Sequence, residues 1–358
     1  MRPTNTDIRN EPLIRRQKQL YSPQTGNMPD NVFITGANSF IGVHIISHIL
    51  KSSDSNCYLL IRASTKNEAK QKLREAFKKW KIEDISFDRL KIFTGDLCHE
   101  RMGLSTEEFT QIRIDTGQVI HLAMTPLYHF PYSHFERIWI PELKRMIDFC
   151  GDKEYPKVLH YTSSFNANFF TDDNDFAALN TNAWQSGYAG FKWVAEKAIE
   201  NAVNNGLRAS VYNIPLVLGS EEHGICPRHY SIWMILDMFL QSGYYFDFSF
   251  KIMPVDILAS LISSNIQQGR LGKNDPYLRP ALKKQVTHLM LESIAGNMLG
   301  LRYGSIKDVK AGFQNPRRFD FMVPPEFHAL MNKCNFHNGK LPQWFNTEKL
   351  PDASLIFM

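Results

Sequence analysis

Short apolar runs alternate with helix-length segments from Asn31 onward, and this rhythm constrains the fold more than any other feature of the chain. The runs are Val32–Ile34, Cys57–Ile61, Leu90–Phe93, Gln118–Ile120, Val158–Tyr161 and Ala209–Asn213. Parallel strands buried on both faces read as continuous apolar runs, and each needs a crossover of about a dozen residues to reach the next strand. We therefore predict an α/β fold with a Rossmann-type doubly wound parallel sheet, whose ligand binds at the carboxyl ends of the strands.

The rhythm also divides the chain into parts. Residues 1–30 are polar and rich in turn-forming residues, so we expect a flexible N-terminal arm. Residues 31–219 are predicted to form the Rossmann domain. Beyond about Gly219 the alternation breaks, and residues 220–358 are expected to form mainly a smaller, helix-rich substrate-binding lobe. Its segment Ser231–Leu240, rich in Met and aromatic residues, is interpreted as helix core rather than an acyl pocket.

Composition excludes several classes of protein. The net charge is only +5 and the basic residues are dispersed, which argues against nucleic-acid binding. The five cysteines are far apart, without the spacing of a disulfide framework or a zinc site, so we expect a reducing compartment and no metal. No apolar run approaches a membrane span or a signal peptide, and the expected location is cytoplasmic.

The first apolar run leads directly into a glycine-containing turn and then an apolar helix. Gly36 can turn sharply without a Cβ, Gly42 lets the helix pack on the strand, and the helix N-terminus offers N–H groups to a pyrophosphate. Ser39 stands where the usual motif has its middle glycine, so a turn without a ligand is the alternative. The predicted dinucleotide loop comprises Thr35, Gly36, Asn38, Ser39, Phe40, Ile41 and Gly42.

Residues after the next strands indicate which dinucleotide binds. Arg62 ends the second strand, twenty positions after Gly42, where a fold that prefers NAD usually has an acidic residue. An arginine there suits a 2′-phosphate, with Lys72 assisting, so the predicted cofactor is NADP(H). An exposed arginine at a strand end is the alternative. The predicted cofactor walls are Asp96 and Leu97 after the third strand and Leu122 and Ala123 after the fourth.

Tyr188 and Lys192 open a predicted helix and lie one turn apart on one face. A neighbouring ammonium lowers the pKa of a phenol toward working pH, which makes Tyr188 a usable proton donor to a forming alkoxide. Lys192 would also bond the nicotinamide ribose. Ser164, or less well Ser163, ends the fifth strand at the ligand edge and can bond a substrate carbonyl. The predicted catalytic residues are Ser164, Tyr188 and Lys192.

The order of these motifs resembles the extended short-chain dehydrogenase/reductase superfamily over roughly residues 31–260. Several pieces resemble its thioester reductase group more closely, namely Leu60-Ile61-Arg62-Ala63, the charged helix up to Trp80, Gly95-Asp96-Leu97 and Met102-Gly103-Leu104-Ser105. That group includes terminal reductase domains of nonribosomal peptide synthetases, carboxylic acid reductases and fatty acyl-CoA reductases. The resemblance implies a return of the chain to the main domain near residues 252–265, and it adds Ile214 to the cofactor-binding residues.

The resemblance implies an NADPH-dependent reductase of an acyl thioester that gives an aldehyde or alcohol. The thioester would arrive in trans on coenzyme A or on an acidic carrier protein. Trp139 stands where the family usually has an asparagine, and Asn213-Ile214-Pro215 replaces its common Arg-Pro-Gly. These departures keep two alternatives open: a sugar-nucleotide epimerase or ketone reductase of the same superfamily, and a catalytically silent NADP-binding interaction protein.

Overall fold

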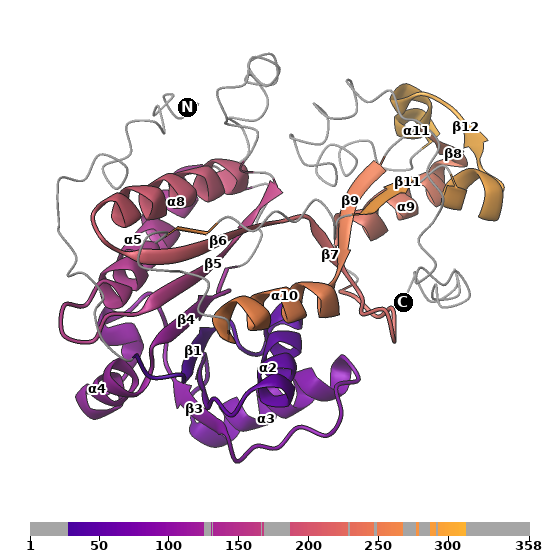
Figure 1. Cartoon of the computed structure of the whole chain (residues 1–358). Coiled ribbons are helices and arrows are strands. Elements are labelled where there is room, and N and C mark those ends of the chain that lie inside the picture. The colour runs from indigo at the N-terminus through magenta and orange to yellow at the C-terminus, as the bar shows by residue number, and fades with distance from the viewer. Residues whose placement is uncertain are drawn as a thin grey trace.

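A parallel sheet with helices on both faces forms the main body of the molecule, and a smaller lobe follows it (Figure 1). The computed structural model describes residues 28–124, 130, 132–165, 167, 187–227, 230–246, 249–267, 277–278, 287–290 and 293–312. The predicted N-terminal arm therefore lies outside the described residues, apart from its last three.

The main sheet has the strand order β10-β6-β5-β4-β1-β2-β3, and its neighbours all pair in parallel. Its strands are β1 (Val32–Thr35), β2 (Cys57–Ile61), β3 (Leu90–Thr94), β4 (Gln118–His121), β5 (Val158–Ser164), β6 (Arg208–Ile214) and β10 (Tyr277–Leu278). The order reverses between β1 and β4, which is the point of a doubly wound sheet where ligands bind. The predicted Rossmann-type fold is confirmed.

Two sets of helices cover the two faces of the sheet (Figure 1). One face carries α2 (Phe40–Ser52), α3 (Lys66–Lys79) and α10 (Val255–Gln267), and the other carries α4 (Thr106–Asp115), α5 (Tyr132–Cys150) and α8 (Gly187–Asn204). A short helix, η2 (Glu100–Gly103), lies between β3 and α4. Among the described residues, no helix is long and apolar enough to cross a membrane.

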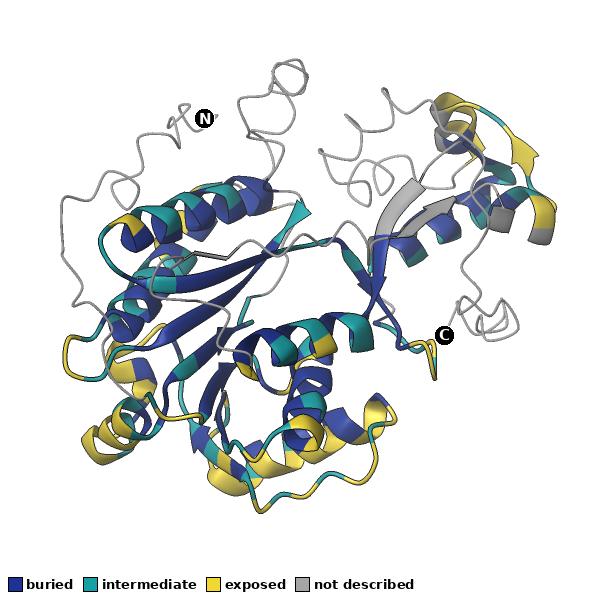
Figure 2. Cartoon of the chain, viewed as in Figure 1, coloured by how far each residue is buried: buried dark blue, intermediate teal, exposed yellow. Residues whose placement is uncertain are grey.

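Alternate strand residues supply the two halves of the core. In β1, Phe33 belongs to the cluster under α5 and α8, while Val32 and Ile34 belong to the cluster under α2 and α10. Figure 2 shows the central strands buried along their length. Burying one such side chain stabilises a fold by roughly 1.5–3 kcal/mol, so the apolar runs that define the strands also fix the sheet between its helices.

The smaller lobe combines helices with two small sheets that the sequence pattern did not predict. One sheet has the order β11-β9-β7 and the other pairs β12 with β8. Its elements are β7 (Leu216–Leu218), α9 (Ser231–Ser242), β8 (Tyr244–Tyr245), β9 (Ser249–Pro254), β11 (Thr287–Met290), η5 (Ser293–Met298), β12 (Arg302–Tyr303) and α11 (Ile306–Gly312). From β9 the chain passes into α10, where Gln267 and Ser263 bond Ser52 of α2.

Candidate functional site

The turn between β1 and α2 is packed so tightly that it requires both of its glycines. Gly36 has φ +71°, and a Cβ on it would lie 2.9 Å from the backbone nitrogen of Ala123. A Cβ on Gly42 would lie 2.5 Å from the carbonyl oxygen of Gly36. The predicted loop and the predicted cofactor wall after β4 are therefore in direct contact, at the reversal point of the sheet.

Ser39 has a structural role that the sequence pattern did not reveal. It is the N-cap of α2, with φ −77° and ψ 165°, and its hydroxyl accepts a hydrogen bond of 3.0 Å from the Gly42 N–H. This backbone conformation does not need a glycine, and a serine is a preferred cap. Asn38 and Ser39 are both exposed. Phe40 and Ile41 follow as the first residues of the helix, where N–H groups have no intrahelical partner and favour an anion.

Thr35 links the dinucleotide turn to the end of β4. Its hydroxyl shares a hydrogen bond of 2.8 Å with the His121 Nδ1 and accepts one of 3.4 Å from the Ala123 N–H. Burial lowers the pKa of His121 to about 3, and the Lys192 charge acts in the same direction. His121 is therefore neutral, and its hydrogen bond to Thr35 joins the end of β4 to the dinucleotide turn, next to the half-buried Leu122 and Ala123.

The residues predicted to recognise the nucleotide phosphate gather at the ends of β2 and β3. The Arg62 guanidinium pairs with the Asp96 carboxylate at 2.8 Å, and the Lys72 ammonium donates to the Arg62 carbonyl at 2.9 Å. Partial burial would raise the pKa of Asp96, but the Cys98 N–H and the Arg62 charge lower it overall. The Arg62 side chain is 72% exposed, which leaves it accessible to an anion.

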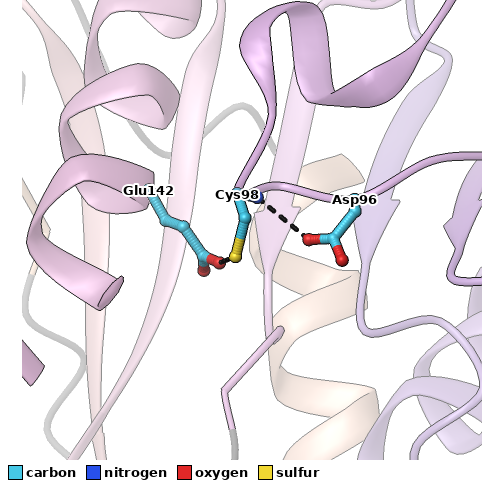
Figure 3. A group of neighbouring side chains, drawn as sticks. All are labelled: Asp96, Cys98 and Glu142. Atoms are coloured by element: carbon cyan, nitrogen blue, oxygen red, sulfur yellow. Dashed lines mark hydrogen bonds between the residues drawn. The ribbon is translucent and has the colours of Figure 1, made fainter. Parts of the chain in front are cut away.

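A buried carboxyl on α5 lies next to this group (Figure 3). The Cys98 thiol donates to Glu142 Oε1 at 3.0 Å, and the Cys98 N–H donates to Asp96 at 2.9 Å. The hydrogen bond to Glu142, together with burial, raises the pKa of the Cys98 thiol to about 12, so the thiol stays protonated. The three groups lie within 4.8 Å of one another and are all metal-ligand types, but a protonated thiol and an arginine-paired Asp96 are poor ligands. Leu97 stands between Asp96 and Cys98 in the sequence, and its carbonyl accepts a hydrogen bond from the Arg145 side chain.

Lys192 occupies a closed position at the other end of the site. Its ammonium donates to the Thr162 carbonyl at 2.8 Å and to the Tyr161 hydroxyl at 3.3 Å. It also lies 4.8 Å from the Tyr161 ring centroid and 5.9 Å from that of Tyr188. Burial lowers the pKa of Lys192 to about 7, and the charge of Glu196 opposes this effect. The predicted Tyr-Lys pair is thus brought together, with Tyr161 as an unpredicted third member.

The two serines at the end of β5 differ in their surroundings. Ser163 is buried and its hydroxyl donates to Glu196 of α8. Ser164 is only half-buried and pairs in register with Ile214, the last residue of β6. Because Ser163 is buried whereas Ser164 is partly accessible, the geometry favours Ser164 over Ser163 for the predicted carbonyl contact.

Two further aromatic residues, Tyr230 and Trp139, bear on the predicted site. Tyr230, which the sequence did not single out, has its ring centroid 6.2 Å from that of Phe40 in the dinucleotide turn. Burial raises its pKa, and the nearby Cys226 and Tyr188 add to the shift. Trp139 packs at the edge of the core under α5, and its buried Nε1 has no partner among the described residues. It therefore cannot supply the contacts of an asparagine.

Comparison with known proteins identifies a family for most of this region. The model of an NAD-binding family described as male sterility protein matches residues 34–262, which contain every predicted site residue. The crystal structure of the terminal R domain from the myxalamid PKS-NRPS biosynthetic pathway superposes with a TM-score of 0.69 at 19% identity. The match covers 87% of this chain and 81% of that domain.

Two relatives by sequence are much longer proteins. A linear gramicidin synthase of Brevibacillus parabrevis is 24% identical over 258 residues, which are 69% of this chain and 5% of that protein. The L-2-aminoadipate reductase of Eremothecium gossypii is 24% identical in its large subunit over 261 residues, which are 66% of this chain and 19% of that protein. The chain therefore spans only a small part of the length of the relatives it matches.

Proposed function

Since the chain belongs to the NAD-binding family described as male sterility protein, in the thioester reductase-like group of the extended short-chain dehydrogenase/reductase superfamily, we propose that it is an NADPH-dependent reductase of acyl thioesters. The observation that carries the proposal is the buried Lys192, whose ammonium lies against both Tyr161 and Tyr188 at the ligand edge of the sheet. Buried lysines are costly, so this one is best explained by a chemical task.

The dinucleotide turn fits the cofactor on its own geometry. Gly36 lets the turn approach the backbone that follows β4, and Gly42 lets α2 pack on the turn itself. The α2 N-terminus presents backbone N–H groups where a pyrophosphate would bind. Arg62, exposed at the end of β2, would hold a 2′-phosphate in exchange for its pairing with Asp96. When bound, NADPH supplies the hydride that adds to the thioester carbonyl carbon.

The chain's own side chains would manage charge and protons at the carbonyl oxygen. Ser164 donates a hydrogen bond to that oxygen, and Tyr188 donates its phenolic proton as negative charge develops there. The Lys192 ammonium stabilises the phenolate that Tyr188 leaves behind. The resulting hemithioacetal then breaks its carbon–sulfur bond and releases an aldehyde and a thiol. Tyr161 is less suited as the donor, because complete burial raises its pKa well above the usual value.

The substrate we propose is an acyl chain on a carrier protein or on coenzyme A. The two relatives are, by their names, a subunit of a linear gramicidin synthase and the large subunit of an L-2-aminoadipate reductase, and the matched region makes up a small share of each. The chain carries 41 basic and 36 acidic residues, a mild excess that suits an acidic carrier or the phosphates of coenzyme A. We place the protein in the cytoplasm because its separated cysteines suit a reducing compartment.

The test is NADPH consumption with acyl-coenzyme A and with acyl-carrier protein, measured by loss of the nicotinamide absorbance. We expect turnover with at least one thioester and a fall of about 10²- to 10⁴-fold in Tyr188→Phe, because the proton donor is lost. NADPH binding, followed by fluorescence titration, should be nearly unchanged in that variant. Equal turnover by the wild type and Tyr188→Phe would contradict the mechanism.

The same assay separates the alternatives. Reduction of free ketones or conversion of sugar nucleotides, without thioester turnover, would identify the epimerase or ketone reductase activity. Nucleotide binding without turnover on any of these substrates would identify an NADP-binding interaction protein, for which Trp139 in place of an asparagine is the structural argument.

A further inference from the structure

A buried carboxyl lies one helical turn beyond Lys192. Glu196 is on the inner face of α8, only 5% exposed, and residues four apart on a helix are neighbours on one face. Its Oε1 accepts a hydrogen bond from the Ser163 hydroxyl of β5 and one of 2.9 Å from the Asn213 amide of β6. Side chains of two strands therefore hold this carboxyl beside the lysine.

The charged and titratable groups that face Lys192 come from three elements. From β4, His121 is neutral because its pKa is lowered to about 3. From β5, Tyr161 is neutral because burial and the nearby Tyr188 and Glu196 raise its pKa well above the usual value. From α8 come Tyr188 and Glu196 themselves. Of these groups Glu196 is the carboxyl, and its charge raises the pKa of Lys192 against the effect of burial.

The hydrogen-bond donors around Glu196 leave that charge in place. Ser163 and Asn213 donate hydrogen bonds, which favour the ionised carboxylate, but neither brings a positive charge. Asn213 stands where the resemblance placed a common arginine. An arginine at that position would bring a positive charge to the carboxylate, whereas the asparagine donates a hydrogen bond without adding charge.

We propose that Glu196 is a positioning residue that favours the protonated form of Lys192 inside the closed site, so that the Tyr188–Lys192 pair works to a higher pH than it would without this carboxylate. The inference rests on the proposed reductase function, because a protonated Lys192 matters for holding the cofactor ribose and for activating Tyr188. Its physical basis is the attraction between a buried carboxylate and a buried ammonium about one turn apart. That attraction offsets part of the desolvation of the lysine.

The first experiment compares the pH profiles of kcat in the wild type and Glu196→Gln. Activity should fall as pH rises through the Lys192 pKa, because the charged lysine is the working form. Glutamine keeps an acceptor for Ser163 and Asn213 but removes the charge, so this alkaline fall should move to lower pH by about one unit. Glu200→Gln is the matched control, since Glu200 lies one turn further, is only half-buried and pairs with Lys197; it should leave the profile unchanged.

The second experiment does not depend on turnover. In the folded chain the pKa of Lys192 is about 7, below the unfolded value of about 10.4, so the unfolded state binds more protons between these values. Stability against urea should therefore rise with pH across this window. Glu196→Gln should move the start of the rise to lower pH by about one unit. In a Lys192→Met background the same substitution should leave the pH dependence unchanged.

The outcomes separate the inference from the function on which it rests. A shift in the stability curve with no thioester turnover would keep the Glu196–Lys192 coupling and reject the proposed reductase. Turnover that falls equally at every pH in Glu196→Gln, with an unshifted stability curve, would reject the coupling and leave the reductase in place. A shift that persists in the Lys192→Met background would assign the effect to another group and overturn the proposal.

Discussion

The two ends of the site lie at the same edge of one parallel sheet but in opposite surroundings. At the nucleotide end, Arg62 is 72% exposed and pairs with Asp96, and Lys72 is 40% exposed. At the reductase end, Lys192 and Glu196 are each 5% exposed and are held by groups from β5, β6 and α8. The first set is an open group of surface charges, and the second is a closed polar network.

The difference decides how strongly each end depends on a single side chain. An exposed ion pair contributes about 0–1 kcal/mol and is screened by salt, so the nucleotide end can exchange Asp96 for a phosphate at little cost. A buried ammonium or carboxylate left without its partners costs several kcal/mol. We therefore expect substitutions at the reductase end to change both catalysis and stability, and those at the nucleotide end to change mainly affinity.

The largest effect is expected from Lys192→Met, which removes the buried ammonium and keeps the volume of its stem. Turnover should fall by about 10²- to 10⁴-fold, because Tyr188 loses the neighbouring ammonium that stabilises its phenolate and so makes it a proton donor. The wild type should gain stability from about pH 7 upward, while the variant should lack this rise. Urea unfolding at a series of pH values checks the second point, and identical curves would show that Lys192 titrates normally.

A smaller effect should separate the two serines of β5. Ser164→Ala should lower kcat by about 10²-fold, as loss of one oxyanion donor does, with little change in stability. Ser163→Ala should instead lower the free energy of unfolding by about 1–3 kcal/mol, because buried Glu196 loses a donor. Steady-state kinetics and urea unfolding on both variants make the comparison. If Ser163→Ala has the larger kinetic effect, the roles are reversed.

Local sequence patterns predicted six of the seven described strands of the main sheet, because each of the six contains an apolar run. The structure extends most of these by one residue at an end, and β5 runs three residues further, to Ser164. The seventh strand, β10, has only two residues and was not predicted. The smaller lobe's strands were missed because they have two to six residues and pair with distant segments. Pairing of this kind leaves no local periodicity to detect.

The site residues likewise fall into those that the sequence predicted and those that it did not. Gly36, Arg62, Tyr188 and Lys192 follow spacings that a sequence displays, and the fold brings each to the ligand edge. Tyr161, Tyr230 and Glu196 were missed as site residues because each is defined by a neighbour from another element. Ser39 was interpreted as a weakened glycine motif, although the hydroxyl works as a helix cap. A sequence shows residue types and spacings, but it does not show which side chains share a buried hydrogen bond.

The smallest effect, and the sharpest test of the open end, is expected from Arg62→Ala. We expect NADPH affinity to fall about tenfold, or ~1.4 kcal/mol, with NADH affinity nearly unchanged, since one charge-assisted contact to the 2′-phosphate is lost. The free energy of unfolding should change by less than about 1 kcal/mol, because the Arg62–Asp96 pair is exposed. Raising the salt concentration should weaken NADPH binding in the wild type more than in the variant.

Lys72→Ala is the control for general loss of positive charge at this end, since its ammonium bonds the Arg62 carbonyl and Glu68, and its effect should be smaller. Equal losses for NADPH and NADH in Arg62→Ala would mean that the arginine supports the loop around Asp96, and the choice of cofactor would then have to be made elsewhere along the crevice.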